Sequence, residues 1–121
     1  MRDPLAQLSF EETGGVLIGR VEGEIESVNA DQLRAALARR LANDSAGLVL
    51  DLTGAAYLDS AGVELLFDLS RRLRTHRQRL RLVVPVAAPM RRVLDLCDIE
   101  DVAPMDATIE AAIEALRQAD D

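Results

Sequence analysis

Residues 48–73 place an uninterrupted apolar run shortly before a segment with helical periodicity, and this succession constrains the fold more than any other part of the sequence. The run lacks polar alternation (Leu48, Val49, Leu50, Leu52), so we expect a strand that is buried on both faces. Beyond a polar connection, apolar residues recur at the three- and four-residue spacing of one helix face: Val63, Leu66, Leu69 or Ser70, and Leu73. The sequence therefore predicts a buried strand, a short elbow and an amphipathic helix.

The elbow ends in Asp59-Ser60-Ala61-Gly62. An Asp-Ser pair at the start of a helix offers side-chain oxygens to amides that lack intrahelical partners, which is ordinary capping. The same amides and the helix dipole would favour a phosphate on Ser60. We therefore expect a helix N-terminus with one hydroxyl in its first turn.

The residues before this unit predict a hairpin and a helix. Leu8 and Phe10 belong to a first strand, and Thr13-Gly14-Gly15 is a turn signal. Residues 16–22 alternate and should pair back on the first strand, and Gly23-Glu24-Ile25-Glu26 leaves the second strand. Ser27 or Asn29 should cap a helix that ends within residues 43–47 and carries an i, i+4 stripe of Leu33, Leu37 and Leu41.

The residues after the central helix predict a parallel crossover and two more helices. Residues 80–84 form an apolar strand that Pro85 stops, so strand, helix and strand make a right-handed parallel unit. Pro89 begins a short helix with Met90, Val93, Leu94 and Cys97. Residues 101–105 are expected as a last strand, which Pro104 confines to an edge. Thr108 should cap a final helix with a buried stripe of Ile109, Ala112, Ile113 and Leu116.

Together these elements predict one α/β domain over residues 1–121. We expect a mixed sheet of four or five strands, about four helices mainly on one face, and the hairpin at one edge. The apolar fraction of 49% and the charged fraction of 29% are those of a globular chain, and no apolar run is long enough to span a bilayer. Residues 1–10 carry no secretory signal, so we expect a cytoplasmic protein without direct membrane insertion.

Charge and residue types exclude several functions. A formal charge of -7 disfavours a nucleic-acid partner. Residues 71–81 nevertheless hold six arginines and no acid. A solvated helix end is the favoured interpretation of this cluster, ahead of a basic face for an acidic protein and well ahead of nucleic-acid binding. With only Cys97 and His76 the chain offers no internal disulfide and no zinc site, and we expect no cofactor.

The sequence contains few of the residue patterns that an active site requires. A hydrolase elbow needs Gly-x-Ser-x-Gly, but Leu58 stands where the first glycine should be. If Ser60 and His76 share one helix, they are about 24 Å apart at a rise of ~1.5 Å per residue. The Gly14-Gly15 pair lacks the spacing and the lysine of a phosphate-binding loop. We therefore expect a protein that is not an enzyme.

Four features together resemble a STAS domain of the anti-sigma factor antagonist type. They are the order of the elements, Gly23-Glu24-Ile25-Glu26 after the second strand, Leu50-Asp51-Leu52 in the central strand, and Asp59-Ser60-Ala61-Gly62 at the next helix. The resemblance covers essentially the whole chain. In place of the second hydroxyl of the family's Asp-Ser-Ser/Thr-Gly motif stands Ala61, and Glu26 replaces the aspartate that ends its Gly-Glu-Leu-Asp loop.

The resemblance implies a phosphorylation-controlled binding protein. Ser60 is then the phosphorylated serine, and the unmodified chain binds an anti-sigma factor that is also a serine kinase of the histidine-kinase-like ATPase type. ATP belongs to that kinase, and a phosphatase resets the switch. The implied partner surface comprises the loop Gly23, Glu24, Ile25, Glu26 and Ser27 beside Asp59, Ser60, Ala61, Gly62, Val63 and Glu64.

Two other functions stay open from the sequence. The first is a STAS accessory subunit of a membrane transport or lipid-export complex, which would bind its partner without phosphorylation. The second is a small esterase that uses Ser60 and takes its base from another chain.

Overall fold

The computed structural model describes residues 6–41 and 45–118 of the 121-residue chain. Their order of strands and helices is the predicted one, with a short 3-10 helix added before the last strand. The elements are β1 (Ala6–Thr13), β2 (Val16–Ile25), α1 (Ala30–Arg40), β3 (Gly47–Leu58), α2 (Ser60–Thr75), β4 (Arg79–Val83), α3 (Pro89–Leu96), η1 (Ile99–Asp101), β5 (Met105–Asp106) and α4 (Ile109–Gln118).

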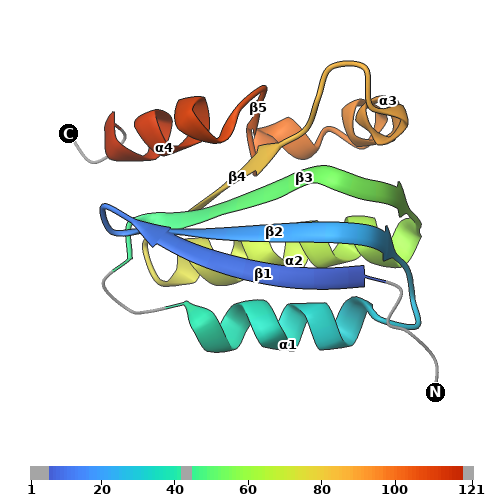
Figure 1. Ribbon diagram of the computed structural model, residues 1–121, viewed down its shortest axis with the longest axis horizontal. Coiled ribbons are helices and arrows are strands. Elements are labelled where there is room, and N and C mark those ends of the chain that lie inside the picture. The colour runs from blue at the N-terminus through green and yellow to red at the C-terminus, as the bar shows by residue number, and fades with distance from the viewer. Residues whose placement is uncertain (1–5, 42–44, 119–121) are drawn as a thin grey trace.

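The strands form one five-stranded sheet in the order β1-β2-β3-β4-β5. β1 pairs antiparallel with β2, and the three following pairs are parallel. The hairpin therefore forms one edge of the sheet and β5 the other, while β3, α2 and β4 make the expected crossover. Because β2, β3 and β4 are parallel, their carboxyl ends lie at the same end of the sheet (Figure 1).

Helices cover both faces of the sheet. α1 and α2 lie side by side against one face, and α4 packs on β3 and β4 from the other (Figure 1). The larger apolar cluster also contains Met90 and Leu94 of α3. Three of the four helices thus contribute to one face, as expected, and a smaller cluster under α4 contains Ala112 and Leu116.

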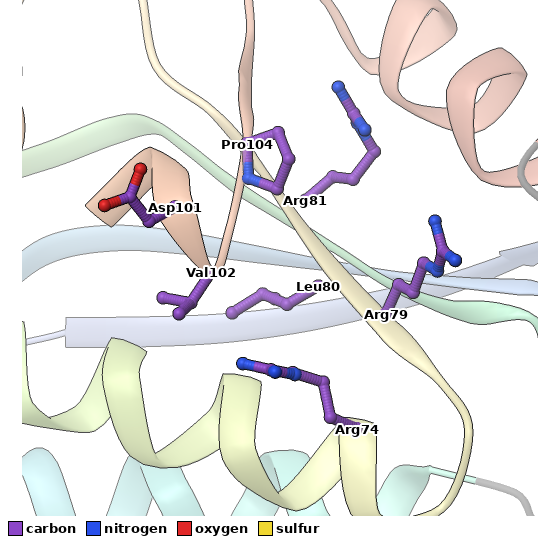
Figure 2. A pocket seen from close by; sticks show the side chains of 7 residues that line it. All are labelled: Arg74, Arg79, Leu80, Arg81, Asp101, Val102 and Pro104. Atoms are coloured by element: carbon purple, nitrogen blue, oxygen red, sulfur yellow. The ribbon is translucent and has the colours of Figure 1, made fainter. Parts of the chain in front are cut away.

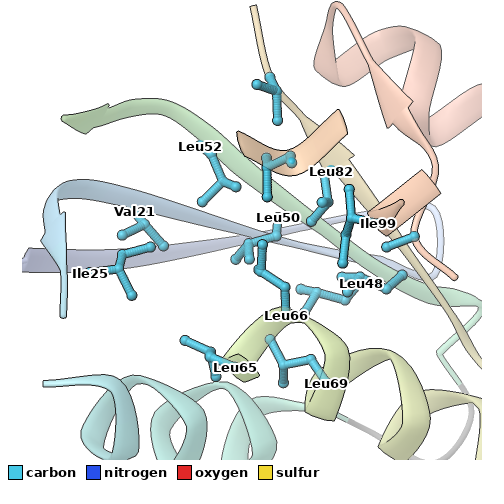
Figure 3. Packing of buried hydrophobic residues seen from close by; sticks show 14 of the residues in the cluster. Val21, Ile25, Leu48, Leu50, Leu52, Leu65, Leu66, Leu69, Leu82 and Ile99 are labelled. Atoms are coloured by element: carbon cyan, nitrogen blue, oxygen red, sulfur yellow. The ribbon is translucent and has the colours of Figure 1, made fainter. Parts of the chain in front are cut away.

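β3 is buried on both faces, as its apolar sequence predicts. Leu48, Leu50 and Leu52 point into the larger cluster, where they meet the leucines of α2 (Figure 3). Val49 belongs to the smaller cluster under α4. This double burial fixes the register of β3 because a slip of one residue would exchange its two faces.

The boundaries of two strands differ from the prediction. β3 continues to Leu58, so the expected polar elbow shrinks to the single residue Asp59. β2 continues through Gly23 and Glu24 to Ile25, although these residues were expected to leave the strand. Both strands are longer because their ladder persists to the pair Ile25 and Leu58.

The expected alternation of β2 is confirmed. Val16 and Ile18 belong to the smaller cluster, whereas Leu17 and Val21 belong to the larger one, so successive residues face opposite sides of the sheet. Residues 16–19 are all buried, because β2 lies between β1 and β3 with an apolar cluster on each of its faces.

The C-terminal segments follow the prediction closely. The amide of Ala111 donates to Thr108 Oγ1 at 3.1 Å, which is the expected cap of α4. The last strand is an edge strand, but it comprises Met105–Asp106, because residues 99–101 form η1 instead. Of the expected stripe on α3, Met90 and Leu94 are buried and Val93 is exposed. α1 ends at Arg40, before the expected range of residues 43–47, because the backbone of Leu41 is extended. Asn43 itself lies outside the described residues.

Leu66 and Leu96 offer a matched test of the core. Leu66 on α2 is 0% exposed, whereas Leu96 on α3 is 77% exposed. Leu66→Ala should lower the free energy of unfolding by about 2–5 kcal/mol, because it leaves a cavity under the sheet. Leu96→Ala should change it by less than about 0.5 kcal/mol. Urea denaturation measures both values, and equal losses in the two variants would contradict the assigned packing.

Candidate functional site

The carboxyl ends of β2 and β3 bring the two segments of the expected partner surface together. Glu24 pairs with Tyr57, and Ile25 pairs with Leu58. The amide of Asp59 then donates to the carbonyl oxygen of Ile25 at 3.2 Å. The residues after β2 and the first turn of α2 are therefore neighbours, although 32 residues separate Ser27 from Asp59.

The carboxylate of Asp59 joins these two segments. Its Oδ1 accepts from the amide of Gly62 at 3.0 Å, which caps α2 as predicted. Its Oδ2 accepts from the amide of Ser27 at 3.1 Å. One side chain thus fixes the start of α2 and the loop before α1, and hydrogen bonds of this kind are strengthened by the charge of the acceptor.

Asn29 holds the same loop from its other side. The side chain accepts from the amide of Glu26 at 2.9 Å and donates to the carbonyl oxygen of Glu24 at 2.8 Å. It therefore makes no capping hydrogen bond to α1, although Ser27 or Asn29 was expected to do so. Asn29 is the only buried residue of the loop that carries a polar side chain, and sequence reasoning missed its role because a cap and a loop clamp use the same residue type.

Gly62 is required by close packing at the start of α2. A Cβ at this position would lie 2.4 Å from Leu58 Cδ1 and 3.1 Å from the carbonyl oxygen of Ile25. Only glycine lets the first turn of α2 approach the ends of both strands without displacing them. Close packing within the fold thus explains the glycine at position 62 without any contact to a partner.

The remaining predicted site residues differ in exposure. Ser60 is the first residue of α2 and is exposed, as are Glu64, Glu24 and Ser27. Glu26, Ala61 and Gly23 are half-buried, and so is Val63, which packs against the larger cluster. Ile25 and Gly62 are buried, so they support the surface and are not part of it.

Two apolar side chains beside this surface were not predicted. Val28 follows Ser27 and is 71% exposed, and Tyr57 precedes Leu58 and is 49% exposed. No sequence pattern indicates their exposure, because an apolar residue next to a strand end is more often buried. These two side chains make the end of the sheet partly apolar.

The histidine of this chain does not lie near Ser60. His76 caps the carboxyl end of α2, so it lies at the far end of the helix that Ser60 begins. Among the residues that the structure describes, no group of His, Cys, Asp or Glu could hold a metal ion. None of the described helices is long and apolar enough to cross a membrane.

The chain belongs to the STAS domain family, whose model matches residues 7–112. It is 28% identical over 113 residues to BtrV of Bordetella bronchiseptica, which is named as an anti-sigma factor antagonist, and the match covers 93% of this chain and 97% of that one. An anti-sigma factor antagonist from Mycobacterium paratuberculosis has the same fold, with a TM-score of 0.82 and 28% identity over 93% of this chain and 94% of that one.

The antagonist SpoIIAA in its unphosphorylated form also shares the fold, with a TM-score of 0.72 and 24% identity over 93% of this chain and 97% of that one. These similarities confirm the predicted family and α/β fold. The name of BtrV, an anti-sigma factor antagonist, agrees with the expectation that the chain is not an enzyme.

The bridge made by Asp59 can be tested by substitution. Asp59→Ala should lower the free energy of unfolding by about 1–2 kcal/mol, because the cap of α2 and the bond to Ser27 are both lost. Hydrogen exchange at the Ser27 and Gly62 amides should accelerate. The control Asp31→Ala removes an exposed acid from the first turn of α1 and should change stability by less than about 0.5 kcal/mol. Unchanged exchange at Ser27 would contradict the bridge.

Proposed function

We propose that this chain is an anti-sigma factor antagonist that binds an anti-sigma factor through the joined ends of β2 and β3. The binding surface comprises the exposed parts of residues 23–27 and 59–64, with Val28 and Tyr57 beside them. The partner is a serine kinase of the histidine-kinase-like ATPase type, which binds the unmodified chain and switches it off by phosphorylating Ser60. Binding and release of the anti-sigma factor control a sigma factor indirectly, in the cytoplasm. A phosphatase can reverse the phosphorylation.

The observation that carries the proposal is the position of Ser60. It is exposed in the first turn of α2, next to the residue whose carboxylate joins both segments. A kinase can reach its hydroxyl without unfolding the domain. A modification there alters the centre of the surface and not its margin.

Charge explains how a phosphate would act. Phosphorylation adds about -1.5 to -2 charges. Glu64 lies four residues further along α2 on the same helix face, and the carboxylate of Asp59 precedes Ser60, so the dianion would join two acids. A partner that closes over Val28 and Tyr57 would have to desolvate this charge, which costs several kcal/mol and reduces affinity by orders of magnitude.

The relatives support the class of partner. BtrV and the Mycobacterium paratuberculosis protein are both named as antagonists of anti-sigma factors. SpoIIAA has also been solved in a phosphorylated form, with a TM-score of 0.65 to this chain. Ala61 leaves Ser60 as the hydroxyl of the motif, and Glu26 keeps the negative charge of the loop.

Phosphorylation is tested by incubating the chain with an anti-sigma factor kinase of the same genome and ATP, followed by mass spectrometry. We expect one phosphate, located on Ser60 and absent from Ser60→Ala. Ser27→Ala is the matched control, because Ser27 is the other exposed serine of the surface, and it should be modified like the unaltered chain. Modification of Ser60→Ala to the same extent would exclude Ser60 as the acceptor.

The effect of charge on binding is tested with two variants of similar size. Ser60→Asp should weaken binding to the kinase at least tenfold, whereas Ser60→Asn should retain affinity within about threefold, because only the first adds a charge. Isothermal titration calorimetry measures the affinity of both variants for the kinase. Full binding by Ser60→Asp, together with no phosphate on Ser60, would reject the switch and leave a STAS subunit that binds its partner without modification.

A further inference from the structure

A groove lies where the edge of β4 loses its partner strand. It has a volume of about 280 Å³ and is lined by α2, by the first half of β4 and by the segment around η1 (Figure 2). Its lining includes Leu80, which faces α2 as part of the larger apolar cluster. It also includes Arg79 and Arg81, which strand alternation turns to the opposite face of the sheet. A concavity lined from both faces of one strand lies at the edge of that strand.

The ladder between β4 and the short β5 stops at Leu82. The amide of Leu82 donates to the carbonyl oxygen of Pro104 at 2.9 Å. One step earlier, a parallel ladder would need an amide from Pro104, which has none, and the carbonyl oxygen of Val102. That oxygen accepts from Ser70 Oγ at 2.8 Å instead. Among the described residues, the main chain of Leu80 therefore has no strand partner on this side.

Both main-chain groups of Leu80 point toward the groove. Amides two residues apart in a strand point to the same side, so the amide and carbonyl groups of Leu80 point outward like those of Leu82. One residue of an added antiparallel strand can exchange both hydrogen bonds with Leu80, as in strand addition to an open sheet edge. Leu80 is almost completely buried, so this pairing would satisfy main-chain groups that water reaches poorly.

Arginines flank this edge on both faces. Arg74 of α2 lines the groove on the side of Leu80, and Arg79 lines it on the opposite side. Both are exposed, and neither makes an ion pair within the part of the chain that the structure describes. Arg81 is already held by Asp106 in a bidentate pair, with Nε to Oδ2 at 2.7 Å and Nη2 to Oδ1 at 3.1 Å. The guanidinium groups of Arg74 and Arg79 point away from each other (Figure 2), so they suit two separate acids and not one anion.

An extended peptide matches this arrangement because its successive side chains point to opposite faces. We propose that the open edge of β4 binds an extended segment of another protein that carries two successive acids. The first acid pairs with Leu80 through its main chain, and its carboxylate reaches Arg74. The second acid opposes Arg79 on the other face. The arginines outnumber Asp101, the acid in the lining, so the charge of the groove is complementary to such a segment.

The site is independent of the proposed switch. Arg74 lies fourteen residues after Ser60 on the same helix, or roughly 21 Å along its axis at a rise of ~1.5 Å per residue. A partner centred on Ser60 need not cover the groove. The two proposals can therefore fail separately.

The test is an NMR titration of the ¹⁵N-labelled chain with two blocked hexapeptides of equal charge, Thr-Val-Glu-Glu-Val-Thr and Thr-Glu-Val-Glu-Val-Thr. In an extended chain the acids of the first peptide point to opposite faces, and those of the second point to the same face. The first peptide should shift the amide of Leu80 in a saturable way and leave Ser60 unshifted. The second should bind about fivefold more weakly, because it reaches only one of the two arginines. Equal binding of the two peptides, or no shift at Leu80, would overturn the proposal.

Variants show whether the named arginines act. Arg74→Gln and Arg79→Gln should each weaken binding of the first peptide about fivefold and abolish its advantage over the second. Arg92→Gln changes an exposed arginine of α3 and should leave both affinities unchanged. All three positions are exposed, so the variants should fold, and their amide spectra verify this. Equal weakening by Arg92→Gln would overturn the site in favour of diffuse attraction. Tighter binding of a thymidine hexanucleotide than of the first peptide at Leu80 would overturn it in favour of a nucleic acid.

Discussion

The parallel pairing of β2 with β3 determines where the candidate site forms. β3 is buried by α2 on one face and by α4 on the other, and this burial fixes its register against β2. Because the two strands end side by side, the loop before α1 and the first turn of α2 meet at one place. Asp59 can then accept hydrogen bonds from both, and Gly62 can approach the ends of both strands. The candidate site therefore results from the strand pairing, together with the hydrogen bonds of Asp59 and the close packing at Gly62.

Much of this arrangement is predictable from the sequence because burial leaves a periodic pattern. The absence of polar residues between Leu48 and Leu52 indicates cover on both faces, and the spacing of Leu66, Leu69 and Leu73 indicates a helix that faces the sheet. The cap by Asp59 follows from its residue type and position. These features are local, so a single sequence contains them.

Other features depend on contacts between distant segments and leave no local pattern. The extension of β2 to Ile25 depends on its partner strand, and the clamp by Asn29 depends on how the loop folds over it. The exposure of Val28 depends on what the rest of the fold leaves uncovered. The arginine cluster is visible in the sequence, but the sequence does not show that Arg74 lies near η1 and β4 around one concavity.

In the proposed function, the negative charge of a phosphate on Ser60 controls access to the joined ends of β2 and β3. The most direct measurement is the dissociation constant of the chain for its anti-sigma factor kinase, before and after stoichiometric phosphorylation of Ser60 by that kinase. We expect phosphorylation to raise the dissociation constant at least tenfold and removal of the phosphate by a phosphatase to restore it. An unchanged dissociation constant for the fully phosphorylated chain would rule out control by Ser60.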